Sequence, residues 1–141
     1  REVKPDAKVA IDLFDRACKL EDGDACVRLG MMFYDGDRVS PDPGRAASYF
    51  ERACATNNST GCGLAGVVYS KGRGVNANSA KAYEFYLKGC NLGRAEGCYA
   101  AGGLLEQDSD VNDSERTPQG LFEKGCKMGL QESCEKAERM K

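Results

Sequence analysis

The segment Leu29-Gly30-Met31-Met32-Phe33-Tyr34-Asp35-Gly36-Asp37-Arg38-Val39 returns 36 residues later as Ala65-Gly66-Val67-Val68-Tyr69-Ser70-Lys71-Gly72-Arg73-Gly74-Val75. Both copies keep a glycine, then an aromatic residue, a second glycine and a valine at the same spacing. A third copy has Gly102, Leu105 and Val111 in the corresponding positions. A fixed period of this length is the signature of a repeat protein, in which similar units stack on one another.

The eight cysteines follow the same period. They form four pairs whose members are eight residues apart, and each pair follows the last by 36 residues: Cys18 and Cys26, Cys54 and Cys62, Cys90 and Cys98, Cys126 and Cys134. The repeats run over residues 10–45, 46–81 and 82–117, with a partial capping repeat at 118–141. At 141 residues we expect a single repeat domain over 1–141.

The spacing within each repeat predicts two helices. The first carries apolar residues at helical intervals, such as Ala46, Tyr49, Phe50 and Ala53. Capping residues are expected just before it at the repeat-related positions Asp42, Asn78 and Ser114, with Pro43 in the first turn.

The second helix follows a short polar turn, and Asp24 and Thr60 are its expected caps. Its predicted buried face holds Cys26, Leu29, Gly30 and Phe33. Glycine inside a helix costs about 1 kcal/mol relative to alanine. The recurrence of Gly30 therefore predicts that a neighbouring helix crosses there with no room for a side chain. The fold class is all-α, an α/α solenoid of antiparallel helix pairs.

Each cysteine pair brackets the turn between two such helices. Eight cysteines allow 105 connectivities, and the repeat symmetry selects four local disulfides, one per repeat. Closing a loop of this size is worth about 2.6 kcal/mol in the chain-entropy model. Zinc sites use cysteines that are closer together in the sequence. A catalytic thiol usually has a histidine as its base, and this chain has no histidine. Disulfides imply an oxidising compartment, either the periplasm or the cell exterior.

Composition excludes several function classes. The net charge of −2 gives no basic footprint for nucleic acid, and no apolar run is long enough for a membrane span. The chain starts at Arg1 rather than at Met, which is consistent either with a trimmed sequence or with a secreted protein whose signal peptide has been removed. We expect a monomer.

The quoted segments resemble the Sel1-like repeat pattern L-G-x-x-Y-x-x-G-x-G-V, a relative of the TPR-like helical repeats. The cysteine pair in every repeat resembles the cysteine-rich branch, which includes the Helicobacter cysteine-rich proteins. In the third copy Asp108 and Asp110 replace the loop glycines. The resemblance implies an adaptor that binds a peptide or a partner protein on its concave face. Some cysteine-rich members are penicillin-binding proteins with weak β-lactamase activity, and other secreted members are immunity proteins or engage host factors.

In family members the second helix lines the concave face. Opposite its buried side we expect an apolar groove rimmed by Arg28, Lys71 and Glu106. The alternative is that the apolar side chains pack between adjacent repeats. The candidate binding residues are Val27, Arg28, Met31, Tyr34, Leu64, Val67, Lys71, Tyr99 and Glu106.

Two motifs with other possible chemistry are weaker. Ser133 and Lys136 match the S-x-x-K motif of serine β-lactamases, without its companion motifs. The segment 108–113 opens like a calcium loop, but Asp113 stands where the loop needs glycine. Asn57, Asn58 and Asn112 head glycosylation sequons, which we interpret as surface turns. We therefore assign no catalytic residue, metal ligand or cofactor.

Overall fold

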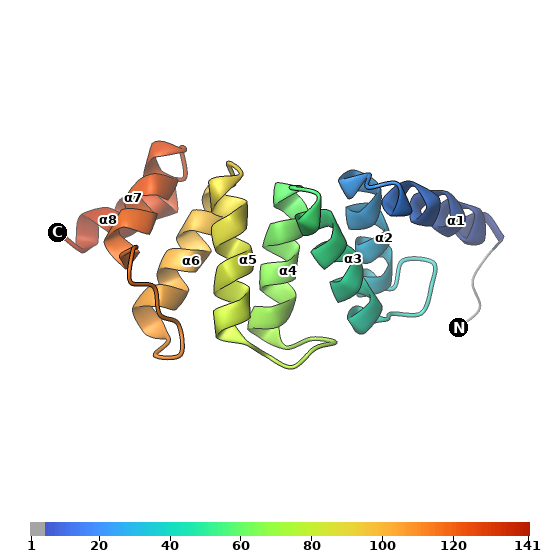
Figure 1. Ribbon diagram of the computed structural model, residues 1–141, viewed down its shortest axis with the longest axis horizontal. Coiled ribbons are helices and arrows are strands. Elements are labelled where there is room, and N and C mark those ends of the chain that lie inside the picture. The colour runs from blue at the N-terminus through green and yellow to red at the C-terminus, as the bar shows by residue number, and fades with distance from the viewer. Residues whose placement is uncertain (1–4) are drawn as a thin grey trace.

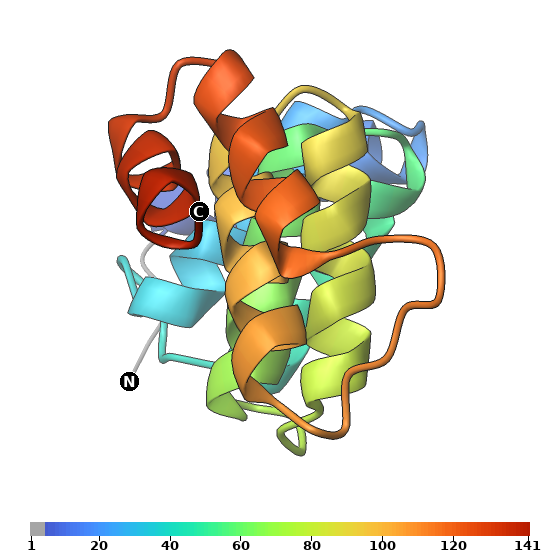
Figure 2. The ribbon, with the colours of Figure 1, turned by 90° about the vertical axis from the view of Figure 1, so that its left-hand side faces the viewer.

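The chain folds into a row of helices. The computed structural model describes residues 5–141, and every regular element in that range is an α-helix. Figure 1 shows the helices side by side in chain order, with the two termini at opposite ends of the row. Their bounds are α1 Pro5–Lys19, α2 Gly23–Asp35, α3 Pro43–Ala55, α4 Ser59–Lys71, α5 Ser79–Asn91, α6 Ala95–Gln107, α7 Pro118–Lys127 and α8 Gln131–Arg139. The predicted all-α solenoid is confirmed, and Figure 2 looks along it from the α7 and α8 end.

The first helices of two repeats begin at their predicted caps. The Asp42 side chain accepts a hydrogen bond from the Arg45 backbone N–H, at 3.1 Å. The Asn78 side chain accepts one from Lys81 in the same way, at 3.0 Å. Each bond satisfies a backbone donor that the first turn of a helix leaves free.

The caps predicted for the second helices are wrong by two residues. Asp22 and Asn58 cap α2 and α4, because the preceding turn closes within one left-handed residue, such as Asn57 with φ of 66°. Asp24 instead accepts a hydrogen bond from the Asn58 side chain at 2.8 Å, which joins α2 to α4. Thr60, its equivalent one repeat later, accepts one from Arg94 at 3.3 Å.

Ser114 is also not a cap, because the loop before α7 is longer. Thr117 accepts the capping hydrogen bond from Gly120, and Pro118 fills the first helical position, where its fixed φ is favourable. The Asp113 carboxylate accepts hydrogen bonds from the backbone of Glu115 and Arg116 and so holds the chain in a turn there.

The mid-helix glycines lie beneath aromatic rings of the next repeat. A Cβ on Gly30 would stand 2.5 Å from the Phe50 ring, one on Gly66 2.6 Å from Tyr86, and one on Gly102 2.9 Å from Phe122. Real Cβ atoms do not approach other atoms so closely. The close helix crossing predicted at these glycines is confirmed, and it fixes how each repeat sits on the one before it.

A second layer of ring contacts strengthens the same junctions. Phe33 stacks on Tyr49 with ring centroids 6.0 Å apart, and 36 residues later Tyr69 stacks on Phe85 at 5.6 Å. The Arg45 guanidinium lies 4.3 Å from the Phe33 centroid, and the Lys81 ammonium lies 4.5 Å from that of Tyr69. The junction between repeats therefore repeats in its side-chain contacts as well as in its backbone.

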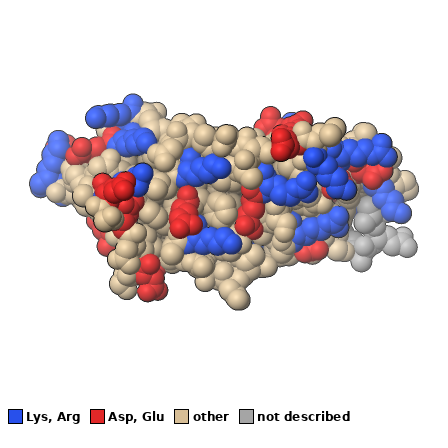
Figure 3. Space-filling model, in the orientation of Figure 1, with Lys and Arg blue, Asp and Glu red and all other residues tan. Residues whose placement is uncertain are grey.

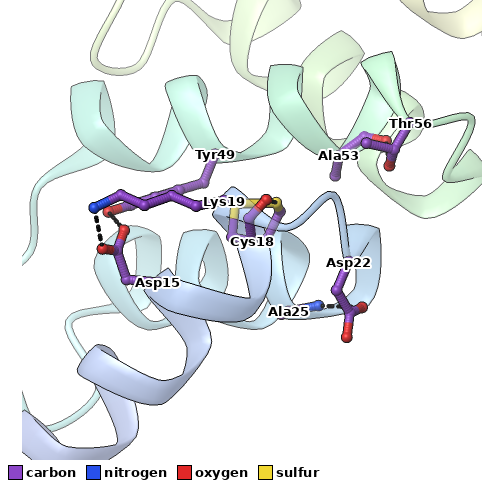
Figure 4. Close-up of a disulfide and its surroundings, with 9 residues drawn as sticks. Asp15, Cys18, Lys19, Asp22, Ala25, Tyr49, Ala53 and Thr56 are labelled. Carbon is purple, nitrogen blue, oxygen red and sulfur yellow. Dashed lines mark hydrogen bonds and ion pairs between the residues drawn. A yellow bond between two sulfur atoms is a disulfide. The ribbon is translucent and has the colours of Figure 1, made fainter.

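All four predicted disulfides are present. They pair Cys18 with Cys26, Cys54 with Cys62, Cys90 with Cys98 and Cys126 with Cys134, with Cα atoms 4.4 to 4.7 Å apart. No cysteine is free. Figure 4 shows the disulfide of Cys18 at the turn between α1 and α2, beside the capping bond from Ala25 to Asp22. Each disulfide links the two helices of one repeat, so the contacts between repeats are non-covalent.

Candidate functional site

All nine candidate binding residues lie on the second helices α2, α4 and α6, on a surface that we call the second-helix face. Met31 is 38% exposed and Tyr99 37%, which is high for apolar side chains inside helices of a solenoid. Arg28, Lys71 and Glu106 are exposed, as a rim requires. Val27, Tyr34 and Leu64 are half-buried against the core, so the alternative of packing between repeats holds for part of their surface.

Three hollows follow one another along this face. The first, of about 330 Å³, is lined by Val27, Arg28, Met31 and Phe14. The second, of about 250 Å³, is lined by Leu64, Val67, Tyr86 and Arg94. The third, of about 510 Å³, is lined by Tyr99, Gly103, Phe122 and Lys136. Tyr86 and Ala100 line both the second and the third hollow, so these two hollows are adjacent.

Three candidate residues lie outside the hollows. The Tyr34 ring packs against Phe50 with centroids 6.2 Å apart and carries the Arg73 guanidinium 4.3 Å above it. Glu106 forms an ion pair with Lys136 at 3.1 Å. Lys71 is exposed and lines none of the three. The hollows are lined by the other six candidates, which are Val27, Arg28, Met31, Leu64, Val67 and Tyr99.

Sequence reasoning missed Tyr86 as a wall of the site. Its side chain is half-buried, and this burial raises the pKa of its hydroxyl. The signal was available in the repeat itself. Each aromatic residue that packs on a mid-helix glycine belongs to the next repeat, so it lies close to the second helix of the repeat before it.

Two arginines on the second-helix face, Arg28 and Arg94, form no ion pair with a carboxylate of residues 5–141. Arg94 donates one hydrogen bond to the Thr60 hydroxyl. Each arginine lines one hollow, Arg28 the first and Arg94 the second. A guanidinium has five donors, so both can donate further hydrogen bonds to a bound chain.

The serine of the S-x-x-K match is a packing residue. Ser133 is fully buried, and its hydroxyl donates a 2.6 Å hydrogen bond to the Phe122 carbonyl of α7. A Cβ on Gly125 would lie 2.5 Å from this oxygen, which shows how closely α7 and α8 approach. Lys136 is paired with Glu106 instead. A buried and bonded hydroxyl is unsuited to nucleophilic attack on a ligand.

Two carboxylates of the calcium-like segment 108–113 interact with other groups of the protein. Asp108 accepts a hydrogen bond from the Asp110 backbone at 2.9 Å. Asp113 accepts one from the Tyr83 hydroxyl at 2.6 Å and pairs with Arg116 at 3.0 Å. The Tyr83 bond and the backbone bond from Glu115 lower the pKa of Asp113 to about 2. Within residues 5–141 no three acidic, cysteine or histidine side chains gather as metal ligands.

Surface charge is mixed rather than concentrated. Figure 3 shows acidic and basic side chains interspersed along the visible side of the stack. The described part of the chain contains no helix with the length and apolarity of a membrane span. Its four disulfides are typical of a protein that folds in an oxidising compartment.

Solved structures with a similar architecture include Sel1 repeat proteins. A Sel1 repeat protein from Oxalobacter formigenes superposes with a TM-score of 0.81 at 19% identity, over 90% of this chain and 52% of that one. A protective antigen of uropathogenic Escherichia coli with an SLR fold gives 0.81 at 22% identity, over 92% and 28%. This chain thus spans about half and about a quarter of their lengths. At these identities the likeness is one of fold.

A third structure shares more of the sequence. Helicobacter pylori cysteine rich protein B is 28% identical, with a TM-score of 0.69 over 95% of this chain and 96% of that one. No curated protein matches significantly. The Sel1 repeat family model matches residues 1–22, 23–58 and 62–93, which is more than half of the sequence. With the repeat period, the glycine junctions and one disulfide in each helix pair, the chain belongs to the Sel1 repeat family.

Proposed function

We propose that this chain is a non-enzymatic interaction module, periplasmic or secreted, that binds a peptide or an extended segment of a partner protein on the second-helix face. Sel1 repeats are typically protein-interaction modules. The observation that carries the proposal is the row of three hollows, whose walls include apolar side chains of α2, α4 and α6. The disulfides support the compartment.

The third hollow suits a large apolar side chain. The rings of Tyr86, Tyr99 and Phe122 line it, and aromatic walls favour aromatic and long aliphatic groups. It is open because Gly103 stands where the earlier repeats have Met31 and Val67. A Cβ on Gly103 would have no atom within 4 Å.

The first two hollows combine apolar walls with a free donor. Met31 is flexible and adapts to different side chains. Arg28 and Arg94 can donate to backbone carbonyls or carboxylates of a bound segment. We therefore expect the ligand to present apolar side chains into the hollows and carbonyl or acidic groups toward the arginines. The buried Ser133 gives no support to the β-lactamase alternative.

The test is a selection from a displayed library of random peptides, followed by measurement of Kd for the enriched peptides by fluorescence anisotropy. We expect enriched peptides to contain aromatic or long aliphatic residues. The double variant Met31→Asp, Val67→Asp should weaken their binding by at least about tenfold, because charge replaces apolar surface at two hollows.

The matched control is Leu20→Asp, Leu92→Asp. Leu20 and Leu92 are exposed apolar side chains, at 84% and 38%, which lie in turns and line none of the three hollows. Circular dichroism checks that both variants fold. Equal binding by the two double variants, or a library that yields no enriched peptide, would exclude the proposed face.

A further inference from the structure

Helix α1 leaves two apolar side chains in solvent, and one of them, Leu13, stands at a position that is buried in α3. Val9 is 60% exposed and Leu13 is 61% exposed. Leu13 stands 36 residues before Tyr49, which is 6% exposed in α3. Phe14, the equivalent of the fully buried Phe50, is only partly buried. Figure 1 places α1 at the end of the row, with α2 on one side of it.

In the interior of the stack this face is covered by the second helix of the preceding repeat. Tyr49 of α3 stacks on Phe33 of α2, and Phe50 packs over Gly30. The Arg45 guanidinium lies over the Phe33 ring, 4.3 Å from its centroid. The junction therefore needs a glycine on the covering helix and a large side chain three residues after it.

Val9, Leu13 and Phe14 occupy the positions of Arg45, Tyr49 and Phe50. We infer that the exposed face of α1, formed by these three residues, is a docking surface for a helix with the second-helix pattern, whose glycine would lie over Phe14 and whose large apolar residue would lie on Leu13. This docking continues an interface that the molecule already uses between α2 and α3 and between α4 and α5. Phe14 also lines the first hollow, so the two surfaces adjoin at this residue, whereas Val9 and Leu13 line none of the three hollows.

A second copy of this chain does not offer such a helix. Its free terminal helix is α8, where Glu138 stands at the glycine position and is followed three residues later by Lys141. A glutamate would collide with the Phe14 ring, and a lysine would be desolvated without a partner. Helix α8 therefore lacks the glycine and the large apolar residue that the junction needs.

The sequence favours a covering helix joined in cis. Val3, Pro5 and Asp6 repeat Val39, Pro41 and Asp42 at the same spacing. The family match over residues 1–22 adjoins the 36-residue match over 23–58. A second helix placed directly before Arg1 therefore keeps the 36-residue period without insertion.

The test fuses a copy of residues 22–36 directly before Arg1 of the full chain, with Cys26→Ala in the copy so that no free thiol is added. The expected result is a rise in Tm of about 5 °C or more, with loss of solvent exposure at the Leu13 methyl groups in NMR. The control fusion carries Gly30→Leu in the copy only, and its leucine should meet Phe14 and remove the gain.

Two further measurements distinguish a covering helix joined in cis from a second copy of the chain. Leu13→Glu in the chain should also remove the gain from the first fusion. Sedimentation velocity should show that the unmodified chain is monomeric. A dimer that Leu13→Glu dissociates would assign the surface to a second copy. Equal Tm for both fusions and the unmodified chain would show that the face of α1 does not take this helix.

Discussion

The strongest single polar contact near the third-repeat loop joins Tyr83 of α5 to Asp113. Its length is 2.6 Å, and the Tyr83 side chain is 5% exposed. Burial, together with this bond, raises the pKa of Tyr83, and the same bond is the first cause of the low Asp113 pKa of about 2. The loop between α6 and α7 lacks the glycines of the other repeats and is tied to α5 by this contact instead.

Replacing Tyr83 with phenylalanine should therefore raise the pKa of Asp113 toward its ordinary value near 4. Because the folded pKa is lowered, ionised Asp113 stabilises the fold fully above about pH 4, and this stabilisation is lost as the pH falls through about 2. The variant should lose less stability across that window. A carbon-13 NMR titration of the Asp113 carboxyl measures the shift directly.

Tyr49→Phe is the matched control, since its hydroxyl contacts Asp15 instead, at 3.4 Å (Figure 4). This substitution should leave the Asp113 titration unchanged. An Asp113 pKa that stays near 2 in Tyr83→Phe would show that the turn backbone alone holds the carboxylate ionised.

At the scale of the element, two adjacent glycines of α6 have opposite roles. Gly102 lies under the fully buried Phe122 ring, which a Cβ at this position would approach to 2.9 Å, whereas Gly103 faces open space. Both lose the same backbone freedom in the helix. Only their surroundings differ, so they separate the packing effect of a side chain from its helix propensity.

Gly102→Leu should lower the free energy of unfolding by about 2 kcal/mol or more, because the added side chain forces α6 and α7 apart. Gly103→Leu should raise it by somewhat less than 1 kcal/mol through helix propensity. Urea unfolding of the two variants measures both changes. Destabilisation of similar size at the two sites would contradict the assigned helix crossing.

The helices and their junctions were predictable from sequence, while three caps were not. Repetition of glycine, aromatic and cysteine positions determines which faces meet, and the structure confirms each disulfide. Caps depend on how a short loop closes, and Asp22 and Asp24 are equally good capping residues by type. The cap predicted at Ser114 is wrong because Pro118 and the turn at Asp113 move the start of α7 further along the chain.

At the scale of the molecule, the disulfides stabilise each helix pair, and the junctions stabilise the packing of one pair on the next. Each disulfide closes a local loop within a helix pair, worth up to about 2.6 kcal/mol by chain entropy. The contacts between pairs come from rings on glycines, stacked aromatics and the hydrogen bonds between second helices. Because small repeats cannot bury their own cores, both kinds of contact are needed.

The same division explains what sequence could say about the binding face. Helical periodicity predicts that Val27, Met31, Leu64, Val67 and Tyr99 share one side of the second helices. It does not predict the hollows, because their walls combine α6 with residues from α5, α7 and α8, such as Tyr86 and Lys136. Those combinations depend on the rotation between repeats, which is a property of the assembled stack.

The central claim is that the second-helix face binds a peptide through its hollows. The most direct test compares Kd of a selected peptide for the unmodified chain and for Gly103→Met, with Ser48→Met on α3 as the control methionine. Gly103→Met fills the third hollow with the side chain that the first repeat has there, without a clash and with a gain in helix propensity. The account predicts an affinity loss of at least about tenfold, together with an unchanged or higher Tm and no loss in Ser48→Met. Full affinity in a folded Gly103→Met variant would contradict it.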